Sequence, residues 1–256
     1  MQTFLEKSNI YIKILINFFY KNKVSNIQIF NIIEQMQIIG PDSLSIILLT
    51  AFFIGLVFSI QIVKEFLSLN AINAVGSVLT ISFLRELSPV LTSIILIGRI
   101  GSYFTSEIAT MKITEQIDVL YLLDISPFYY LVLPRILAFI IIIPLLNIIS
   151  FITSLLSSLF ICFIVYNIDS HIFINSSIKS LYFLDIIKSS IKSIIFGFFI
   201  SLISCFCGLN SYGGSKGVGI STTISVVTSL LCIFVLDFCL SYYMFDYLDS
   251  SFVISY

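Results

Sequence analysis

The chain has 256 residues, of which 58% are hydrophobic and only 11% are charged, and its mean hydropathy is +1.09. An ordinary soluble domain carries roughly 25% charged residues, so this composition excludes a soluble globular protein. The formal net charge of −1 argues against a nucleic-acid partner, because phosphate binding needs a basic surface. The apolar runs are continuous rather than alternating, which favours membrane-spanning helices over a β-barrel.

Residues 1–40 are expected to form an interfacial amphipathic segment. Ile10, Ile14 and Phe18 recur at helical spacing with lysines between them, a pattern typical of a helix that lies on a membrane surface. The sequence Gly-Pro-Asp at 40–42 is expected to separate this segment from the first span, with Asp42 or Ser43 as the cap of the next helix.

Five transmembrane helices are expected in one membrane domain, residues 41–256. Their approximate ranges are 44–67, 75–103, 128–164, 187–208 and 220–245. The excess of Lys and Arg places the N-terminus, the stretch 106–124 and the turn 210–219 together in the cytoplasm or in its plastid equivalent. The predicted fold is therefore an all-α polytopic membrane protein. The abundance of Ile, Phe, Ser, Asn and Tyr indicates an AT-rich genome, as in plastids and some reduced bacteria.

Arg85 and Glu86 lie inside the second predicted span, where charged groups are costly and normally face a protein interior, a cavity or a partner. Adjacent helical residues point about 100° apart, so each needs a partner other than its neighbour. Pro89 removes a backbone donor and favours a break or kink nearby. Two interpretations stay open: a pair that reaches the lipid headgroups, or the polar rim of a cavity. Lys192 and Asp237 are further span charges that could pair or complete the same patch.

A stripe of small residues follows in the second span. Gly98, Ser102, Ser106 and Ala109 recur at three- to four-residue spacing beside Arg99 and Gly101, and small residues allow two helices to approach closely. The favoured interpretation is helix packing, against either the same chain or a second copy.

The stretch 106–124 is expected to form a short amphipathic helix between the second and third spans. Thr114 is placed to cap it, and acidic residues suit its first turns. Helices that rest on membranes are normally basic, so this acidic one favours docking of another protein. The candidate docking positions are Glu107, Thr114, Glu115, Gln116, Asp118 and Asp124.

The remaining motifs give no catalytic, metal or nucleotide site. The Gly-rich turn 213–219 has its Ser and Lys in the reverse of the phosphate-loop order. The five cysteines lie within or beside apolar runs and form no disulfide framework, and Cys205-x-Cys207 lacks companion metal ligands. His171 stands alone in a loop. We therefore expect no enzyme and no cofactor on this chain, with any ATP bound by a partner.

Several motifs resemble the MlaE/TGD1 (YrbE-type) permease family of lipid-transporting ABC transporters. The similarity is carried by LRELSPVL at 84–91, GRIG at 98–101, EIATM at 107–111, TEQI at 114–117 and PR at 134–135, and it continues to Asp237.

This resemblance implies a non-catalytic translocation subunit for (phospho)lipid. The implied partners are a second copy, an ABC ATPase that binds ATP and Mg²⁺, an MCE-domain substrate-binding protein and membrane phospholipid. The stretch 106–124 would be the coupling helix in a groove of the ATPase. Arg85 and Glu86 would lie near a lipid cavity between the copies, with Lys192 and Asp237 as further candidates. The implied location is the plastid (chloroplast) inner envelope, or alternatively a bacterial inner membrane.

One other class of function stays open. An ion- or proton-coupled secondary carrier would use Glu86 and Asp237 as titrating groups. Such carriers are commonly built from internal repeats, and this sequence contains no detectable repeat.

Overall fold

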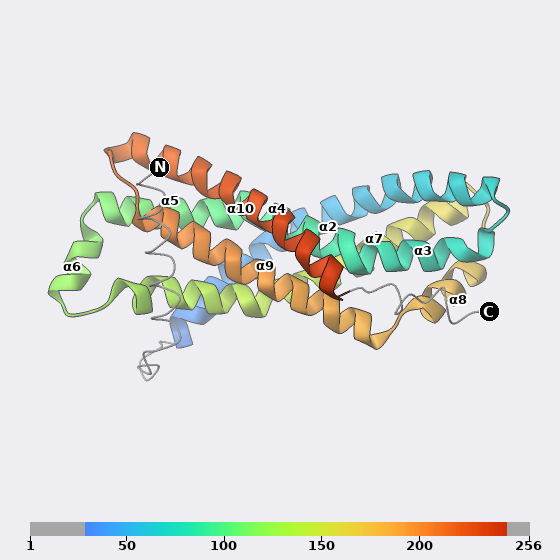
Figure 1. Cartoon of the computed structure of the whole chain (residues 1–256), viewed down its shortest axis with the longest axis horizontal. Coiled ribbons are helices and arrows are strands. Elements are labelled where there is room, and N and C mark those ends of the chain that lie inside the picture. The colour runs from blue at the N-terminus through green and yellow to red at the C-terminus, as the bar shows by residue number, and fades with distance from the viewer. Residues whose placement is uncertain (1–28, 245–256) are drawn as a thin grey trace.

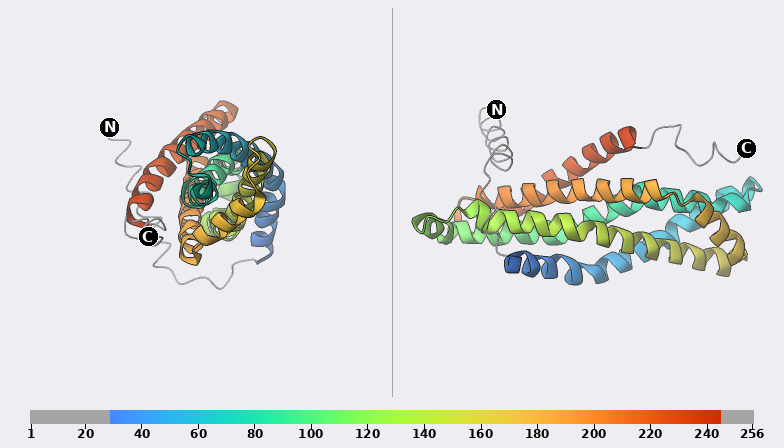
Figure 2. Two further views of the ribbon diagram at one scale, coloured as in Figure 1. Left: turned by 90° about the vertical axis from the view of Figure 1, so that its right-hand side faces the viewer. Right: turned by 90° about the horizontal axis from the view of Figure 1, so that it is seen from below.

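The computed structural model describes residues 29–244, and within them the chain is helical with short connections and no strand. Five segments of this region are long and apolar enough to cross a membrane: α2 (Ile29–Ser68), Ile72–Ile113, Phe128–Ile164, α9 (Phe183–Leu209) and α10 (Gly214–Met244). They run side by side along the long axis of an elongated bundle (Figures 1 and 2). The predicted all-α polytopic membrane fold is confirmed.

The first span differs from the prediction at its beginning. Helix α2 is continuous from Ile29 to Ser68 and contains Pro41, so the predicted helix break at 40–42 is wrong. Ile39 and Ile47, on either side of Pro41, are fully buried, and α2 lies along α7 (Leu133–Ile164). This packing holds the helix together despite the missing donor of Pro41. Residues 1–28, which carry most of the predicted surface helix, lie outside the described residues.

The second span is longer than the predicted 75–103 and contains two π-helical turns. Its elements are η2 (Ile72–Ala74), α3 (Val75–Ser82), η3 (Phe83–Leu87), α4 (Ser88–Leu96), η4 (Ile97–Gly101) and α5 (Ser102–Ile113). Pro89 lies in the first turn of α4, directly after η3. The N–H of Ser88 donates to the carbonyl of Phe83, a π-type bond that widens the turn. The predicted irregular backbone near Arg85 is therefore a widened turn within a continuous helix.

The far end of the bundle is closed by a helix that lies between the predicted spans 128–164 and 187–208. Helix α8 (Ser170–Ser180) lies between α7 and α9 and packs on α3. A Cβ atom at Gly76 would lie 2.5 Å from the carbonyl oxygen of Phe173, so this close approach requires glycine. Asp169 begins α8 and accepts a hydrogen bond from the N–H of His171.

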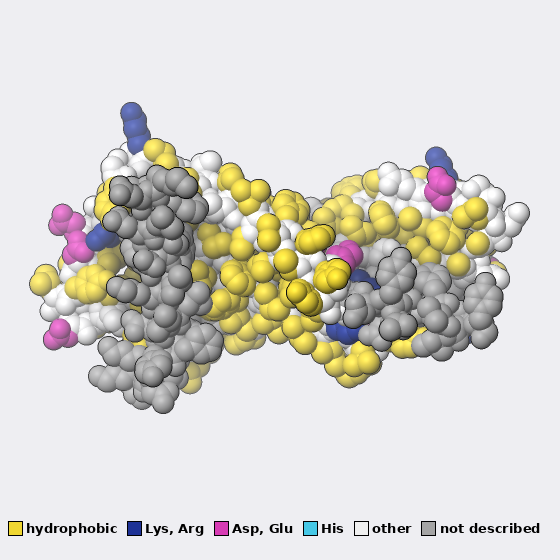
Figure 3. Space-filling view, in the orientation of Figure 1, with side chains coloured by type: hydrophobic (Ala, Val, Ile, Leu, Met, Phe, Trp, Pro, Cys, Tyr) yellow, Lys and Arg dark blue, Asp and Glu magenta, His cyan; other side chains and the backbone are white. Residues whose placement is uncertain are grey.

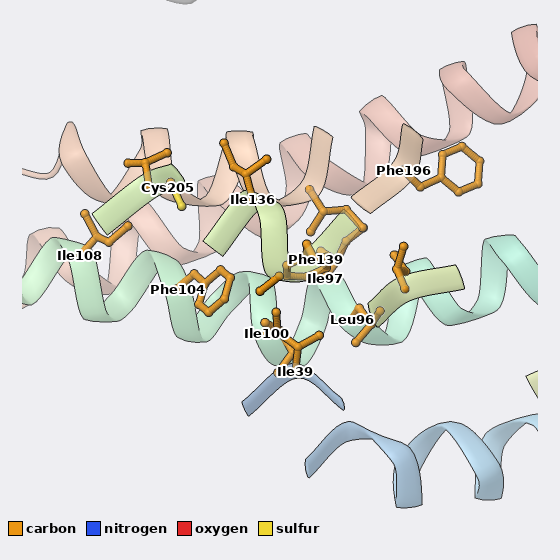
Figure 4. Packing of buried hydrophobic residues seen from close by; sticks show 14 of the residues in the cluster. Ile39, Leu96, Ile97, Ile100, Phe104, Ile108, Ile136, Phe139, Phe196 and Cys205 are labelled. Carbon is orange, nitrogen blue, oxygen red and sulfur yellow. The ribbon is translucent and has the colours of Figure 1, made fainter. Parts of the chain in front are cut away.

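The main core lies where α4, α5, α7 and α9 meet. Phe104, Phe139 and Phe196 are fully buried there, and the rings of Phe104 and Phe139 lie 5.7 Å apart between centroids. Figure 4 shows these residues spread along the core between the helices. By contrast, α10 buries mainly small residues, including Ser225 and Ser229. Its outer face is apolar and exposed, so it forms part of the hydrophobic surface seen in Figure 3.

The connections predicted to lie on one side of the membrane, 106–124 and 210–219, are at the same end of the bundle (Figure 1). The connection between the second and third spans and the turn before α10 lie at the same end, whereas α8 lies at the opposite end (Figure 1). The two regions predicted to share a compartment are thus neighbours in space.

Candidate functional site

Arg85 is placed by η3 and forms an ion pair with a residue far away in the sequence. Its Nη2 lies 2.8 Å from Oδ2 of Asp185, and its Nε donates to the same oxygen at 3.3 Å. Both side chains are largely buried. Because α9 begins at Phe183 rather than near 187, Asp185 lies in its first helical turn and reaches the second span.

Glu86 points to a different partner, as expected for adjacent helical residues. The Nζ of Lys192 lies 2.7 Å from Oε2 of Glu86 and 2.6 Å from Oδ1 of Asp237. The same Nζ donates to the hydroxyl of Ser241 at 2.9 Å and to the carbonyl of Arg85 at 3.1 Å. The expectation that Lys192 and Asp237 belong to one polar patch with Arg85 and Glu86 is therefore confirmed.

We call this set of ion-paired and hydrogen-bonded residues the polar cluster: Arg85, Glu86, Asp185, Lys192, Asp237 and Ser241. Its members come from η3, α9 and α10, so it joins three of the five spans. A second polar chain extends it toward α7, because Ser88 donates to Asn147 at 2.7 Å and Asn147 donates to Ser189 at 2.9 Å.

The polar cluster is buried at its centre and open at one edge. The side chain of Lys192 is 0% exposed, whereas those of Asp237 and Glu86 are 23% and 45% exposed. Figure 3 shows acidic and basic side chains together near the middle of an otherwise apolar face. Carboxylates at the surface of a membrane span require a polar partner or water, so this edge is the candidate site.

The sequence analysis did not find the whole of this polar region. Asp185 lies just outside the predicted fourth span, and Ser88, Asn147, Ser189 and Ser241 were not singled out. A signal was present for Asp185, since Asp185, Ser189 and Lys192 follow at i, i+4 and i+7 and so share one helix face.

The stretch 106–124, which the resemblance gave as the coupling helix, is not one helix, but a short helix follows Thr114 as the residues predicted. Residues through Ile113 continue α5, and the separate helix α6 covers Gln116–Leu122. Thr114 does not cap it: its hydroxyl donates to the carbonyl of Thr110 in the preceding helix. Glu115 begins α6 in the left-handed region, with φ 61°. The sharp reversal explains why α6 projects from the end of the bundle in Figure 1.

The surface of α6 combines acidic and apolar side chains. Ile117 is buried and anchors the helix, while Leu122 is 86% exposed. Asp118 is exposed and pairs with Lys112 at 3.0 Å, and Asp124 follows with φ 56°. An exposed leucine beside carboxylates is a surface suited to a protein partner.

Glu107 does not belong to this surface. Its Oε2 lies 2.7 Å from Nη2 of Arg135, so this partly buried carboxylate is paired with a buried cation of the bundle. The coupling positions predicted from the sequence therefore divide into Glu107 inside and Glu115, Gln116, Asp118 and Asp124 around α6.

The small residues predicted to pack against another helix differ in burial. Gly101 packs on α9, where a Cβ would lie 3.0 Å from Oγ of Ser204, and Ala109 is fully buried. Gly98 is exposed and has nothing within 4 Å of its Cβ position, and Ser102 is half-buried beside it. Arg99 lies in η4 and is half-buried. Within residues 29–244, Gly101 and Ala109 therefore pack inside the chain, and packing of Gly98 against a second copy stays a prediction.

Comparison with known proteins identifies the family. The model of the family Permease MlaE matches residues 32–243. The chain belongs to the MlaE permease family. It is 47% identical to the probable ABC transporter permease protein ycf63 of Pyropia yezoensis, over 98% of this chain and 95% of that protein. It is 45% identical to a probable ABC transporter permease protein of Synechocystis sp., over 84% of this chain and 82% of that protein.

A further relative of this MlaE permease is the chloroplastic protein TRIGALACTOSYLDIACYLGLYCEROL 1 of Arabidopsis thaliana. The two are 44% identical over 84% of this chain and 62% of that protein. The family match contains the whole polar cluster and α6, and it begins within the segment predicted to precede the permease domain. An ABC transporter permease is a membrane subunit that works with an ATPase, which favours this class over an ion-coupled carrier.

Proposed function

We propose that this MlaE permease moves phospholipid, and that the polar cluster lines the path of the lipid headgroup. The observation that carries the proposal is the edge of the polar cluster, where the carboxylates of Glu86 and Asp237 reach the surface of spans that are otherwise apolar. Charges are retained at such depth when they serve a substrate path or a partner.

The chemistry of this edge suits an amphipathic substrate. A phospholipid presents a charged headgroup and two apolar chains, and the cluster presents carboxylates and buried cations beside the exposed apolar face of α10. Lys192 holds both carboxylates in place. An incoming headgroup therefore meets groups whose positions are already fixed, which lowers the cost of ordering them.

We propose that two copies assemble so that the path lies between them. The outer face of α10 and the open position at Gly98 support this, because both leave apolar or small-residue surface uncovered within the described chain. Small residues let two membrane helices pack closely. Arg99, half-buried next to Gly98, would then lie near the second copy.

We propose that α6 is the contact with the ATPase subunit. Its exposed leucine and carboxylates form a compact surface at one end of the bundle. ATP and Mg²⁺ would bind on that partner, and this chain would act without chemistry of its own. At the opposite end, an MCE-domain protein is the proposed partner that receives or delivers lipid. The proposed location is the plastid inner envelope, on the strength of the chloroplastic relative.

The proposal is tested with the complex reconstituted into vesicles. Purified complex should retain phospholipid that is detected by mass spectrometry, and it should move a fluorescent phospholipid in an ATP-dependent way. Glu86→Lys should slow this movement while the complex stays assembled, because it places a cation against Lys192. Lys179→Glu is the matched control, since Lys179 is an exposed charge on α8. An unchanged rate in Glu86→Lys would rule out a role of the cluster in the path.

A further inference from the structure

An ion pair with a buried cation lies close to α6 and outside the polar cluster. Arg135, in the first turn of α7, is 3% exposed, and its Nη2 lies 2.7 Å from Oε2 of Glu107 on α5, whose side chain is 28% exposed. Burying two charges costs free energy that their attraction does not always return. The stability of the fold alone is therefore a weak reason for this pair to exist.

Arg135 contacts two helices besides its own. Its guanidinium carbon lies 5.1 Å from the ring centroid of Phe104 on α5, and Cys205 on α9 lies within electrostatic reach. Phe104, Cys205 and Ile136, the neighbour of Arg135 in the chain, belong to one buried cluster, and Figure 4 labels all three. Among the described residues, Nη1 of Arg135 is buried without a hydrogen-bond partner. A single side chain thus joins α7 to α5 and α9.

The pair also closes a loop that contains α6. The chain enters α6 from α5, which carries Glu107, and leaves it toward α7, which begins just before Arg135. Ile117 fixes α6 to the same core cluster that contains Phe104 and Ile136. Since the ion pair bridges the two flanking helices, α5, α6 and the beginning of α7 are held as one unit.

We propose that the Arg135–Glu107 pair is a positioning device that carries a displacement of α6 into α7 and α9. It would link ATP hydrolysis on the partner to rearrangement of the bundle. This inference rests on the proposed function, in which α6 contacts the ATPase. Without the pair, α5 could follow α6 while α7 stays behind, because the ion pair that bridges these two helices would be lost.

The test separates transmission from stability. The double variant Glu107→Leu/Arg135→Met replaces the pair with apolar side chains of similar size, a change that is often neutral for stability. Arg135→Lys keeps the positive charge. A lysine can replace the single hydrogen bond that Nη2 of Arg135 donates to Glu107. Lys112→Gln is the control, because it removes an exposed cation and its ion pair from the same helix.

Each variant is purified with the ATPase and reconstituted into phosphatidylcholine vesicles that contain a fluorescent phosphatidylglycerol. We expect the double variant to keep its ATPase and to hydrolyse ATP, but to move at least about fivefold less lipid per ATP, the lower end of coupling between distant sites. Arg135→Lys and Lys112→Gln should stay close to the unsubstituted complex.

Two results would overturn the inference. Unchanged lipid movement per ATP in the double variant would reduce the pair to a packing contact. Loss of the ATPase from the double variant alone would mean that the pair only shapes the docking surface. If no ATPase accompanies even the unsubstituted chain, the proposed function itself fails, which is a separate and recognisable outcome.

Discussion

Lys192 on α9 holds Glu86 of the second span and Asp237 of the fifth span at the same time, with its Nζ 2.7 Å and 2.6 Å from their carboxylate oxygens. The lysine is fully buried, so the two carboxylates have a fixed cation behind them and an open side in front. Three membrane helices are therefore joined through one ammonium group at the edge of the proposed lipid path.

Removal of Lys192 should destabilise the protein. Lys192→Met leaves Glu86 and Asp237 beside each other without a cation, and breaking a buried ion pair typically costs about 3–5 kcal/mol. We expect a lower melting temperature in detergent, measured by thermal unfolding. The triple variant Lys192→Met/Glu86→Gln/Asp237→Asn should recover much of this loss, because no unpaired charge remains. A melting temperature that is unchanged in Lys192→Met would contradict the ion-pair geometry.

Gly76 and Gly98 should respond differently to the same substitution. Gly76→Ala places a Cβ against α8, 2.5 Å from the carbonyl oxygen of Phe173, whereas Gly98→Ala meets open space. Overpacking of this kind costs about 1–3 kcal/mol. Gly76→Ala should therefore lower the melting temperature, and Gly98→Ala should leave it nearly unchanged. Equal effects would show that α3 and α8 are not in close contact.

A larger side chain at Gly98 tests the proposed homodimer. Gly98→Leu should leave the single chain folded, since nothing lies within 4 Å of the Cβ position. If the second copy packs on this face, dimers should be reduced, as measured by light scattering of the purified protein in detergent. Gly98→Ala serves as the small-residue control. A dimer that persists in Gly98→Leu would place the contact elsewhere.

The surface of α6 should govern binding of the ATPase without affecting the fold. Leu122→Ser and Asp118→Lys change exposed positions, and the Lys112–Asp118 pair is a surface ion pair worth at most about 1 kcal/mol. We expect less ATPase to be recovered with the tagged permease, at an unchanged melting temperature. Ile178→Ser, an exposed apolar position on α8 at the opposite end, is the control. Full recovery of the ATPase with both α6 variants would exclude this helix as the contact.

The class of fold could be predicted from the amino-acid sequence. In a chain with so little charge, apolar runs about 20 residues long form membrane-spanning helices rather than a soluble core. The sequence also indicated the polar cluster, because Arg85, Glu86, Lys192 and Asp237 are each anomalous in an apolar context. The partner of Arg85 was not predictable in the same way. Asp185 lies close to the beginning of a span, and only the packing of α9 on η3 brings it to Arg85.

Local backbone signals were less reliable than charge. Pro41 resembled a boundary, but α2 continues through it because the flanking residues are buried along α7. Thr114 resembled a helix cap, yet its hydroxyl bonds backward and the reversal takes place at Glu115. Such signals describe an isolated segment, and tertiary packing decided both cases.

The π-helical turn at Phe83–Leu87 absorbs one extra residue in the second span. A π turn accommodates one residue more than an α-helical turn, and in a regular α-helix one residue corresponds to about 100° of rotation around the axis. Loss of a single residue from η3 would let the turn close to an α-helical turn, and α3, which packs on α8, would stay in phase with α4. A one-residue deletion within α3 or α4 would instead rotate the parts of the span relative to each other, so η3 is a place where this span can absorb a change in length.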